Sequence, residues 1–323
     1  MTEMKKTLSV FSGSVNPELA EKIAECLDAK VGAIQLEKFA NGEIYARYLE
    51  SVRGADVFLV QSVAGSHVND ALMELLIMVD AAKRASARTV TAVIAHYGYS
   101  RQDRKAAARE PITAKLVANL LETSGVDRTI AIDLHQGQIQ GFFDTPVNHL
   151  TALPILADYF KSKNFNMDKV CVVSPDVGRA KAAKKFSGLL GSDLVIMHKE
   201  RCAHNQAEVT ALIGDVSGKI CIINDDMIDT AGTLVAAADT LKANGATDIY
   251  VCATHPIFSG PAYERLEASP IKEVVVCDTI PLDPSKVINK MVTVSVAPLM
   301  ARAIMQVYSN GSLSNMFDID FAL

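Results

Sequence analysis

The sequence is poor in the features that mark specialised classes of protein. Its 323 residues include no tryptophan, 6 cysteines and only 6% aromatic residues. The cysteines form no Cys-x-x-Cys pair and most lie within apolar runs, so we expect reduced core residues and exclude a disulfide framework and a zinc site. No apolar stretch approaches the roughly 20 residues that a membrane-spanning helix needs, and residues 1–7 lack the apolar segment of a secretory signal. These absences predict a soluble, cytoplasmic globular protein.

The charge balance restricts the partners that can be expected. Lysine and arginine together number 32, and aspartate and glutamate 37, which gives a net charge of −5. Proteins that bind along nucleic acid usually carry excess positive charge, so nucleic acid is not expected as the main partner. The apolar fraction of 49% and the charged fraction of 21% exclude disorder, collagen and coiled coil as the main architecture.

Short apolar runs rich in β-branched residues recur along the chain. Most of them lack polar alternation, which is typical of strands that are buried on both faces of a parallel sheet. Helical patterns lie between many of them; the first has Asn16 as a possible cap and Pro17 at the first helical position. Alternating strands and helices predict an α/β fold. The runs are Leu8–Phe11, Val57–Gln61, Val90–Ala95, Thr129–Ile132, Val170–Val173, Leu194–Met197, Ile220–Ile223, Ile249–Ala253, Glu273–Cys277 and Thr293–Val296.

The two halves of the chain follow the same pattern. Residues 68–93 and 228–252 each contain a helix of about 15 residues, a turn of small residues and then a strand. This similarity predicts two related α/β domains that arose by duplication, at residues 1–150 and 151–297. The last helix, within about residues 298–323, is a candidate to pack on the first domain.

The richest polar cluster follows the apolar run that begins at Ile220. Asp225, Asp226 and Asp229 precede the small-residue segment Thr230–Thr233, after which a helix begins. Small residues at a helix N-terminus let backbone N–H groups approach an anion such as phosphate. The acids would instead suit the hydroxyl groups of a ribose or a bridging Mg²⁺. An acidic turn before a capped helix is the structural alternative, but three acids at a tight turn repel one another without a ligand.

Two further segments follow expected strands. In the segment 97–105, Arg101 could bind a polyphosphate as a bidentate donor, with Gln102 as an orienting hydrogen bond. Asp133 and His135 are two residues apart, so on an extended chain they would point to the same side, as ligands of one metal ion do. Taken alone, the first segment also suits a solvated loop, and His135 a structural histidine.

Two more segments suggest chemistry only in combination with the others. Lys199 and Arg201 would face one side of an extended chain and offer two cations to a transferring phosphoryl group. Residues 39–43 place an aromatic ring and an acid around a turn. A solvated surface and an ordinary turn are the structural alternatives.

The segment from Asp225 to Thr233 resembles the phosphoribosyl-pyrophosphate binding loop shared by type I phosphoribosyltransferases and ribose-phosphate pyrophosphokinases (phosphoribosyl-pyrophosphate synthetases). That loop alone does not choose between the two families. The other segments occur in the order found in the pyrophosphokinases, and the resemblance covers essentially the whole chain. Further matching stretches are FSGS at 11–14, ESVRGADV at 50–57, LMELLIM at 72–78, ITAKLVANLL at 112–121, QIQGFF at 138–143, VSPD at 173–176 and IFSGPA at 257–262.

The resemblance implies two similar domains like type I phosphoribosyltransferases, each a mainly parallel sheet flanked by helices. It implies Mg²⁺-dependent transfer of the β,γ-diphosphoryl group of ATP to the 1-hydroxyl of ribose 5-phosphate, which supplies nucleotide, histidine and tryptophan biosynthesis. It also implies roles for individual residues. These are catalysis by Lys199 and Arg201; ATP binding by Phe39, Asn41, Gly42, Glu43, Arg101 and Gln102; ribose 5-phosphate binding by Asp225, Asp229, Thr230, Ala231, Gly232 and Thr233; and metal-linked roles for His135 and Asp176, with Asp133 as a secondary candidate.

The resemblance extends to assembly and regulation. It implies a homo-oligomer, a hexamer built from dimers, in which residues 39–43 reach the adenine site of a neighbouring subunit. Members of the family with allosteric control bind inorganic phosphate and ADP at a subunit interface. Four residues align with that regulatory site, although ordinary surface polarity is the alternative: Ser51, Arg53, Ser312 and Ser314.

The chain departs from the family pattern at two positions. Gln136 stands where a shorter residue is usual, and Asn148 where an aspartate is usual. An amide is a poorer cation ligand than a carboxylate, which puts a metal or nucleotide contact there in question. The alternatives to an active synthetase are a non-catalytic homologue that regulates one, a phosphoribosyltransferase, and a regulator that senses phosphoribosyl pyrophosphate. Both Lys199 and Arg201 are present, which disfavours the first.

Overall fold

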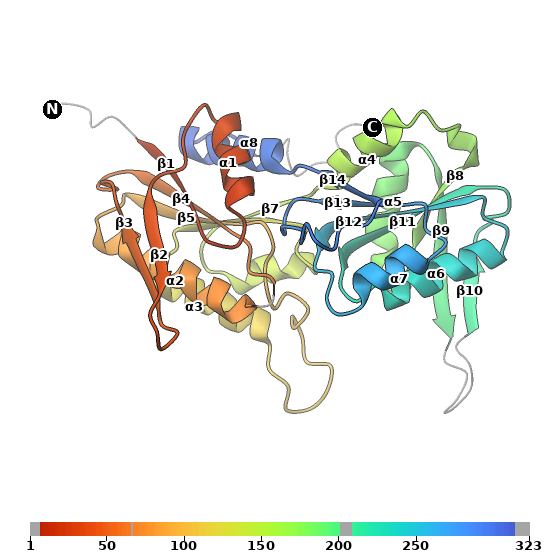
Figure 1. Cartoon of the computed structure of the whole chain (residues 1–323), viewed down its shortest axis with the longest axis horizontal. Helices are drawn as coiled ribbons and strands as arrows, with labels where there is room; N and C mark the ends of the chain where they lie inside the picture. Colours follow the sequence, from red (N-terminus) through yellow and green to blue (C-terminus); the bar gives the residue numbers. More distant parts are fainter. Residues whose placement is uncertain (1–6, 66, 201–208, 314–323) are drawn as a thin grey trace. The chain divides into compact units, whose positions relative to one another are not determined.

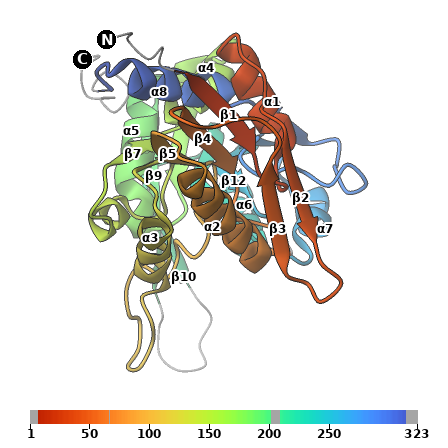
Figure 2. The same cartoon turned by 90° about the vertical axis from the view of Figure 1, so that its left-hand side faces the viewer.

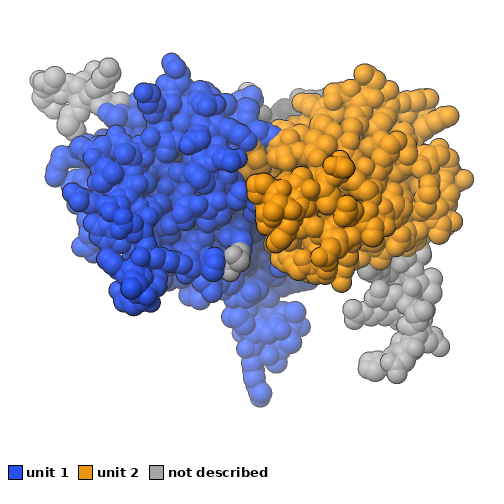
Figure 3. Space-filling model, viewed as in Figure 1, with its two compact units in different colours: residues 1–151, 279–281, 295–323 blue, residues 152–278, 282–294 orange. Residues whose placement is uncertain are grey.

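The structure is a computed structural model that describes residues 7–65, 67–200 and 209–313 (Figure 1). The chain divides into two compact units, coloured separately in Figure 3. The first unit runs to Thr151 and also includes residues 279–281 and the segment from Ser295 onward; the second contains residues 152–278 and 282–294. The sequence did not predict that residues 279–281 return to the first unit, where Thr279 O accepts a hydrogen bond of 2.5 Å from Ser62 Oγ.

A five-stranded parallel sheet forms the centre of the first unit, with strand order β1-β4-β5-β6-β7. The strands are β1 (Leu8–Ser12), β4 (Asp56–Gln61), β5 (Thr89–Ile94), β6 (Arg128–Ile132) and β7 (Val147–Leu150). A separate antiparallel hairpin consists of β2 (Ile34–Lys38) and β3 (Ile44–Tyr48). The helices are α1 (Pro17–Cys26), α2 (Val68–Arg84), α3 (Thr113–Ser124) and α8 (Ala297–Ser309), and the 3₁₀ turn η1 spans Gly137–Phe142. Helices α1 and α8 lie side by side on one face of the sheet, and α2 and α3 lie on the other (Figure 2).

The second unit contains a seven-stranded sheet of order β10-β9-β8-β11-β12-β13-β14, parallel except for β10. The strands are β8 (Val170–Ser174), β9 (Asp193–Glu200), β10 (Val209–Ile213), β11 (Ile220–Ile228), β12 (Asp248–Pro256), β13 (Glu273–Cys277) and β14 (Met291–Val294). The helices are α4 (Leu153–Ser162), α5 (Ala180–Leu190), α6 (Gly232–Ala243) and α7 (Ala262–Ala268), with 3₁₀ turns η2 (Met167–Lys169) and η3 (Val177–Arg179). The predicted α/β class with mainly parallel sheets is therefore confirmed.

Burial explains why the strand patterns lack alternation. Every residue of β4 and of β8 is buried, because helices or neighbouring elements cover both faces of the sheets. Local signals also act as predicted: Asn16 Oδ1 accepts a hydrogen bond of 3.3 Å from Leu19 N, and Pro17 occupies the first position of α1. The sequence thus placed both the sheet interior and the start of the first helix.

Five of the six cysteines lie within the described residues, and none of the five forms a disulfide. Cys171, Cys221, Cys252 and Cys277 are buried as predicted, whereas Cys26 is exposed. Cys202 lies outside the described residues. Among the described helices, none combines the length and apolar content needed to cross a membrane.

Candidate active site

The junction between β11 and α6 forms a tight turn after a buried strand. The turn spans Asp229 to Ala231, and α6 begins at Gly232. Ala231 has φ +59°, in the left-handed region that costs a non-glycine residue of the order of 1 kcal/mol. Strain of this kind persists where surrounding contacts impose it, and it is common at ligand-binding turns. Because of this turn, α6 begins within the segment that is predicted to bind phosphate.

Neighbouring backbone and one arginine hold this turn in place. Phe258 N donates to Ile228 O and Ser259 N donates to Asp229 O, each at 3.0 Å. From α7, Arg265 Nη1 donates to Thr230 O at 2.9 Å. These contacts come from the IFSGPA stretch and the helix after it, and they supply the restraint that the left-handed residue requires.

Two acids at the end of β11 face an arginine. Arg179 Nε lies 3.4 Å from Asp225 Oδ1, and Arg179 Nη1 lies 3.9 Å from Asp226 Oδ1. The Asp225 side chain is 25% exposed, whereas that of Asp226 is only 4% exposed. Burial, together with the neighbouring Asp226 carboxylate, raises the pKa of the Asp225 carboxyl to about 8, and Arg179 opposes that rise. The site therefore disfavours a second negative charge at Asp225, and a ligand that donates hydrogen bonds would stabilise the ionised carboxylate.

Arg179 is a residue of this site that the sequence did not reveal. It follows β8, the strand next to β11 in the sheet, and its backbone N–H donates to Asp176 Oδ1 at 2.9 Å. Asp176, predicted to be metal-linked, thus caps η3, while Ser174 Oγ donates to Asp176 O at 2.6 Å. An aspartate three residues before an arginine, just after a strand, could have drawn attention to Arg179. Its contact with Asp225 could not have been predicted in this way, because it depends on the strand order.

The predicted catalytic residues lie at the edge of what the structure describes. Lys199 belongs to β9, where it pairs with Thr210 of β10, so the extended backbone expected there is present up to Glu200. Arg201 lies outside the described residues. The roles of both remain predictions.

The four predicted adenine-site residues meet at the tip of the β2–β3 hairpin. Phe39 N donates to Glu43 O and Gly42 N donates to Phe39 O, both at 2.8 Å, while Asn41 Oδ1 accepts from Glu43 N at 3.2 Å. Gly42 has φ +91°, a conformation that favours glycine. The Phe39 side chain is 52% exposed, with its ring 5.8 Å from that of Tyr45. An exposed ring on a rigid turn is suited to stacking on a base.

The segment that follows β6 differs in backbone form from its prediction, whereas the one that follows β5 is a loop that is mostly exposed from Arg101 onward. Arg101 and Gln102 are exposed, but the Gln102 side chain already accepts a hydrogen bond from Thr113 Oγ1 at the start of α3. Asp133 was expected on an extended chain with His135, and this is wrong: β6 ends at Ile132 and Asp133 has φ +40°. The reason is that the chain turns into η1 as soon as the pairing with β7 ends. Asp133 and His135 are nonetheless both half-buried around the buried Leu134.

Asn148, one of the two departures from the family pattern, lies buried in β7 and pairs with Ile130 of β6. Its Oδ1 accepts a hydrogen bond of 3.0 Å from Arg128 Nη1. Arg128 is the first residue of β6, whereas Asp133 follows the last, so the amide is occupied at the opposite end of that strand. The other departure, Gln136, precedes η1 and accepts from Ile139 N through its carbonyl at 3.1 Å.

The residues aligned with the regulatory site are only partly described. Ser51 and Arg53 are exposed neighbours, with Arg53 N donating to Ser51 Oγ at 3.4 Å. Ser312 is exposed beyond the end of α8, and Ser314 lies outside the described residues. The predicted phosphate site is therefore untested.

The described residues do not by themselves form a complete set of ligands for a metal ion. Within residues 7–65, 67–200 and 209–313, no three histidine, cysteine or acidic side chains cluster closely enough to hold a metal ion. Mg²⁺ is commonly held by one or two carboxylates together with substrate phosphates and water. The carboxylates of Asp133 and Asp176 fit that pattern as single hard donors, whereas the His135 imidazole suits softer metals better.

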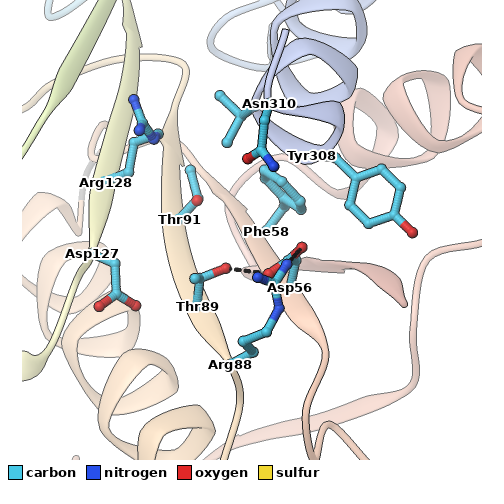
Figure 4. A pocket seen from close by; sticks show the side chains of 10 residues that line it. Asp56, Phe58, Arg88, Thr89, Thr91, Asp127, Arg128, Tyr308 and Asn310 are labelled. Carbon is cyan, nitrogen blue, oxygen red and sulfur yellow. Dashed lines mark hydrogen bonds and ion pairs between the residues drawn. The ribbon is translucent and has the colours of Figure 1, made fainter. Parts of the chain in front are cut away.

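A hollow of about 170 Å³ lies at the amino ends of β4, β5 and β6 (Figure 4). Asp56 in its wall pairs with Arg88 and accepts a hydrogen bond of 2.6 Å from Thr89 Oγ1. Asp127 accepts from Lys83 Nζ at 3.1 Å and from Val90 N at 2.7 Å. The carboxylates are thus compensated by the fold itself, and the hollow is at the other end of these strands from Asp133. Its lining residues are Asp56, Phe58, Arg88, Thr89, Thr91, Asp127, Arg128, Val307, Tyr308 and Asn310.

Comparison with known proteins places the chain in a family. Residues 8–125 match the N-terminal domain of ribose phosphate pyrophosphokinase, and residues 195–318 match the phosphoribosyl synthetase-associated domain. The ribose-phosphate pyrophosphokinase of Fusobacterium nucleatum is 52% identical over 311 residues, 96% of this chain and 98% of the relative. That of Bacillus caldolyticus is 51% identical over 318 residues, 98% of this chain and 100% of the relative. The crystal structure of phosphoribosylpyrophosphate synthetase from Mycobacterium smegmatis has a TM-score of 0.89 at 45% identity and covers 94% of this chain and 100% of that one. The chain therefore belongs to the ribose-phosphate pyrophosphokinase family.

Proposed function

We propose that the protein transfers the β,γ-diphosphoryl group of ATP to the 1-hydroxyl of ribose 5-phosphate, which produces 5-phosphoribosyl 1-diphosphate and AMP. The β11–α6 turn carries this proposal, because it combines a strained phosphate-type turn with acids at the end of the preceding strand. Similarity to named pyrophosphokinases over nearly the full length supports it.

Ribose 5-phosphate binds at this turn. The backbone N–H groups and hydroxyls of residues 230–233 hold the 5-phosphate, since a helix N-terminus with small residues favours an anion. Asp225 and Asp229 cannot contact the phosphate favourably, so they accept hydrogen bonds from the ribose hydroxyls. Donation by those hydroxyls stabilises the ionised form of Asp225, which burial alone disfavours.

ATP binds through segments of the first unit. Arg101 is exposed and offers a planar fork to the phosphates, with Gln102 beside it. Adenine stacks on Phe39, whose ring is exposed at the hairpin tip, while Asn41, Gly42 and Glu43 shape the turn that presents it. A protruding tip of this kind suits the nucleotide site of a neighbouring copy, which agrees with assembly as a hexamer.

His135 and Asp176 are the residues that would hold Mg²⁺, with Asp133 as a secondary candidate. When bound, Mg²⁺ neutralises charge on the phosphate oxygens and lowers the barrier to nucleophilic attack. The capping bond from Arg179 N fixes one oxygen of Asp176 and so orients that carboxylate.

Lys199 and Arg201 stabilise the charge of the diphosphoryl group as it transfers. Such a reaction needs little covalent chemistry from the protein beyond in-line positioning and cancellation of charge.

The proposed enzyme is regulated by inorganic phosphate and ADP. Inorganic phosphate binds Ser51, Arg53, Ser312 and Ser314, where hydroxyls and a guanidinium suit an anion, and ADP acts as a second effector. The enzyme works in the cytoplasm.

The reaction is tested by mixing the protein with ATP, ribose 5-phosphate and Mg²⁺ and following the phosphorus NMR spectrum. We expect AMP and phosphoribosyl pyrophosphate in equal amounts. ADP and inorganic phosphate would contradict diphosphoryl transfer. Binding of ribose 5-phosphate without turnover would instead indicate a non-catalytic homologue.

A further inference from the structure

Arg179 lies beside two acids of the proposed sugar site and has no role in the proposed reaction. Its guanidinium faces Asp225 at 3.4 Å and Asp226 at 3.9 Å, and its side chain is only 19% exposed. No other ion pair is recorded for Asp225 within the described part of the chain. Arg179 is therefore the nearest positive charge to the acid that accepts the ribose hydroxyls.

The contact with Asp225 is electrostatic and leaves the carboxylate available. Arg179 Nε is buried and makes no hydrogen bond among the described residues, so it takes no lone pair of Asp225 Oδ1, which accepts one hydrogen bond of 2.8 Å from the Asp226 N–H. A bidentate arginine–carboxylate pair would instead occupy both oxygens. The observed geometry compensates charge while leaving acceptor capacity for a ligand.

The backbone of Arg179 is held more firmly than its side chain. Asp176 Oδ1 accepts its N–H at 2.9 Å, and α5 begins at the next residue, Ala180. The base of the side chain is therefore fixed at the end of β8, next to β11. Without this cation, the Asp225 carboxylate would face the neighbouring Asp226 carboxylate without the positive charge nearest to it, and their repulsion would turn the more exposed Asp225 away.

We propose that Arg179 is a positioning residue for ribose 5-phosphate: it balances the Asp225–Asp226 pair and holds the Asp225 carboxylate as an acceptor for a ribose hydroxyl. This inference rests on the proposed function of the β11–α6 turn. It assigns to Arg179 a role in binding the sugar and none in contacting ATP.

The test compares Arg179→Ala and Arg179→Lys with the wild-type protein by calorimetric titration of ribose 5-phosphate and by steady-state kinetics. Arg179→Ala should raise the Kd and KM for ribose 5-phosphate about 10- to 100-fold, while the KM for ATP changes less than about twofold. Arg179→Lys keeps the charge and should recover part of the affinity. Arg88→Ala is a matched control, because Arg88 also pairs with a buried acid, Asp56, but in the hollow of the first unit. It should leave the Kd for ribose 5-phosphate unchanged.

The possible results distinguish failure of the role proposed for Arg179 from failure of the proposed function. Wild-type protein that fails to bind ribose 5-phosphate would overturn both. Wild-type binding with an unchanged Kd in Arg179→Ala would overturn the role of Arg179 alone. Equal increases in KM for both substrates, with no recovery in Arg179→Lys, would show a merely structural ion pair and would also overturn it.

Discussion

The two units place the same elements in the same order but use one junction differently. Each runs strand, helix, two-stranded hairpin, strand, helix, strand, helix and two more strands, so that β4–α2 in the first unit corresponds to β11–α6 in the second. In the first unit, Gln61 Nε2 and Ser14 N both donate to Glu74 Oε1 at 2.7 Å. In the second, Asp225 meets Arg179 without a hydrogen bond from its Nε. The first junction is closed by these hydrogen bonds to the Glu74 side chain, whereas Asp225 at the second accepts from the adjacent Asp226 N–H at 2.8 Å and faces a cation.

The hairpins differ in a similar way. The β2–β3 hairpin pairs only within itself, and its tip exposes Phe39. The β9–β10 hairpin is joined to the main sheet through the pairing of β9 with β8, so Lys199 lies within a strand of that sheet. A similar order of elements therefore does not imply the same chemistry, which depends on the side chains at the corresponding turns.

The largest expected effect on kcat comes from a substitution in the β9–β10 hairpin, and a substitution in the β2–β3 hairpin serves as its control. Lys199→Ala should lower kcat by about 100- to 1000-fold, on the scale of roughly 3 kcal/mol for one preorganised donor, with little change in KM. Lys38→Ala, at the end of β2, is the control: its ion pair with Asp70 is exposed, so kcat should be retained. Steady-state kinetics checks both. An unchanged kcat for Lys199→Ala would remove it from the mechanism.

The acid at the second junction should make stability depend on pH. The pKa of Asp225, about 8 in the folded protein, is above its ordinary value, so the folded state binds the proton more tightly and loses stability as pH rises from about 4 to 8. Asp225→Asn cannot ionise and should avoid this loss. Thermal unfolding at several pH values should show a stability gain of the order of 1–2 kcal/mol at pH 8 that fades toward pH 5. A gain that is the same at every pH would contradict this explanation, and ribose 5-phosphate binding should weaken in the same variant.

Backbone strain offers a paired test of the two junctions. Ala231→Gly should stabilise the protein by up to about 1 kcal/mol, because glycine adopts the left-handed conformation without steric cost. Gly65→Ala, at φ +86° in the β4–α2 connection, should destabilise by a similar amount although nothing lies within 4 Å of the added Cβ. Chemical denaturation measures both. Ribose 5-phosphate affinity should change only for Ala231→Gly, and a change in Gly65→Ala would break the comparison.

The smallest effect concerns the family departure at Asn148. Asn148→Asp would face Arg128 with a carboxylate in place of an amide, so stability should change by less than about 1 kcal/mol. The Mg²⁺ concentration for half-maximal activity should not change, because this group lies at the end of β6 away from Asp133. A large drop in the Mg²⁺ requirement would instead indicate that position 148 takes part in metal binding.

Much of the fold and the β11–α6 site could be predicted because their signals are local. Buried parallel strands, the Asn16–Pro17 start of α1 and the acidic turn before a helix all depend on residues close together in the chain. The extended form expected at Asp133 failed because the chain leaves the sheet where its pairing with β7 ends. Periodicity does not reveal where a pairing partner stops.

The sequence by itself determined the α/β class, the positions of most strands and the position of the small-residue turn before α6, since hydrophobic period and small-residue turns act over a few residues. The tertiary structure decided which groups meet. Strand order brings β8 beside β11, and so Arg179 to Asp225 across 46 positions of sequence. The pairing of β6 with β7 likewise brings Asn148 within hydrogen-bonding distance of Arg128. Such meetings depend on register between distant strands, which local pattern does not encode.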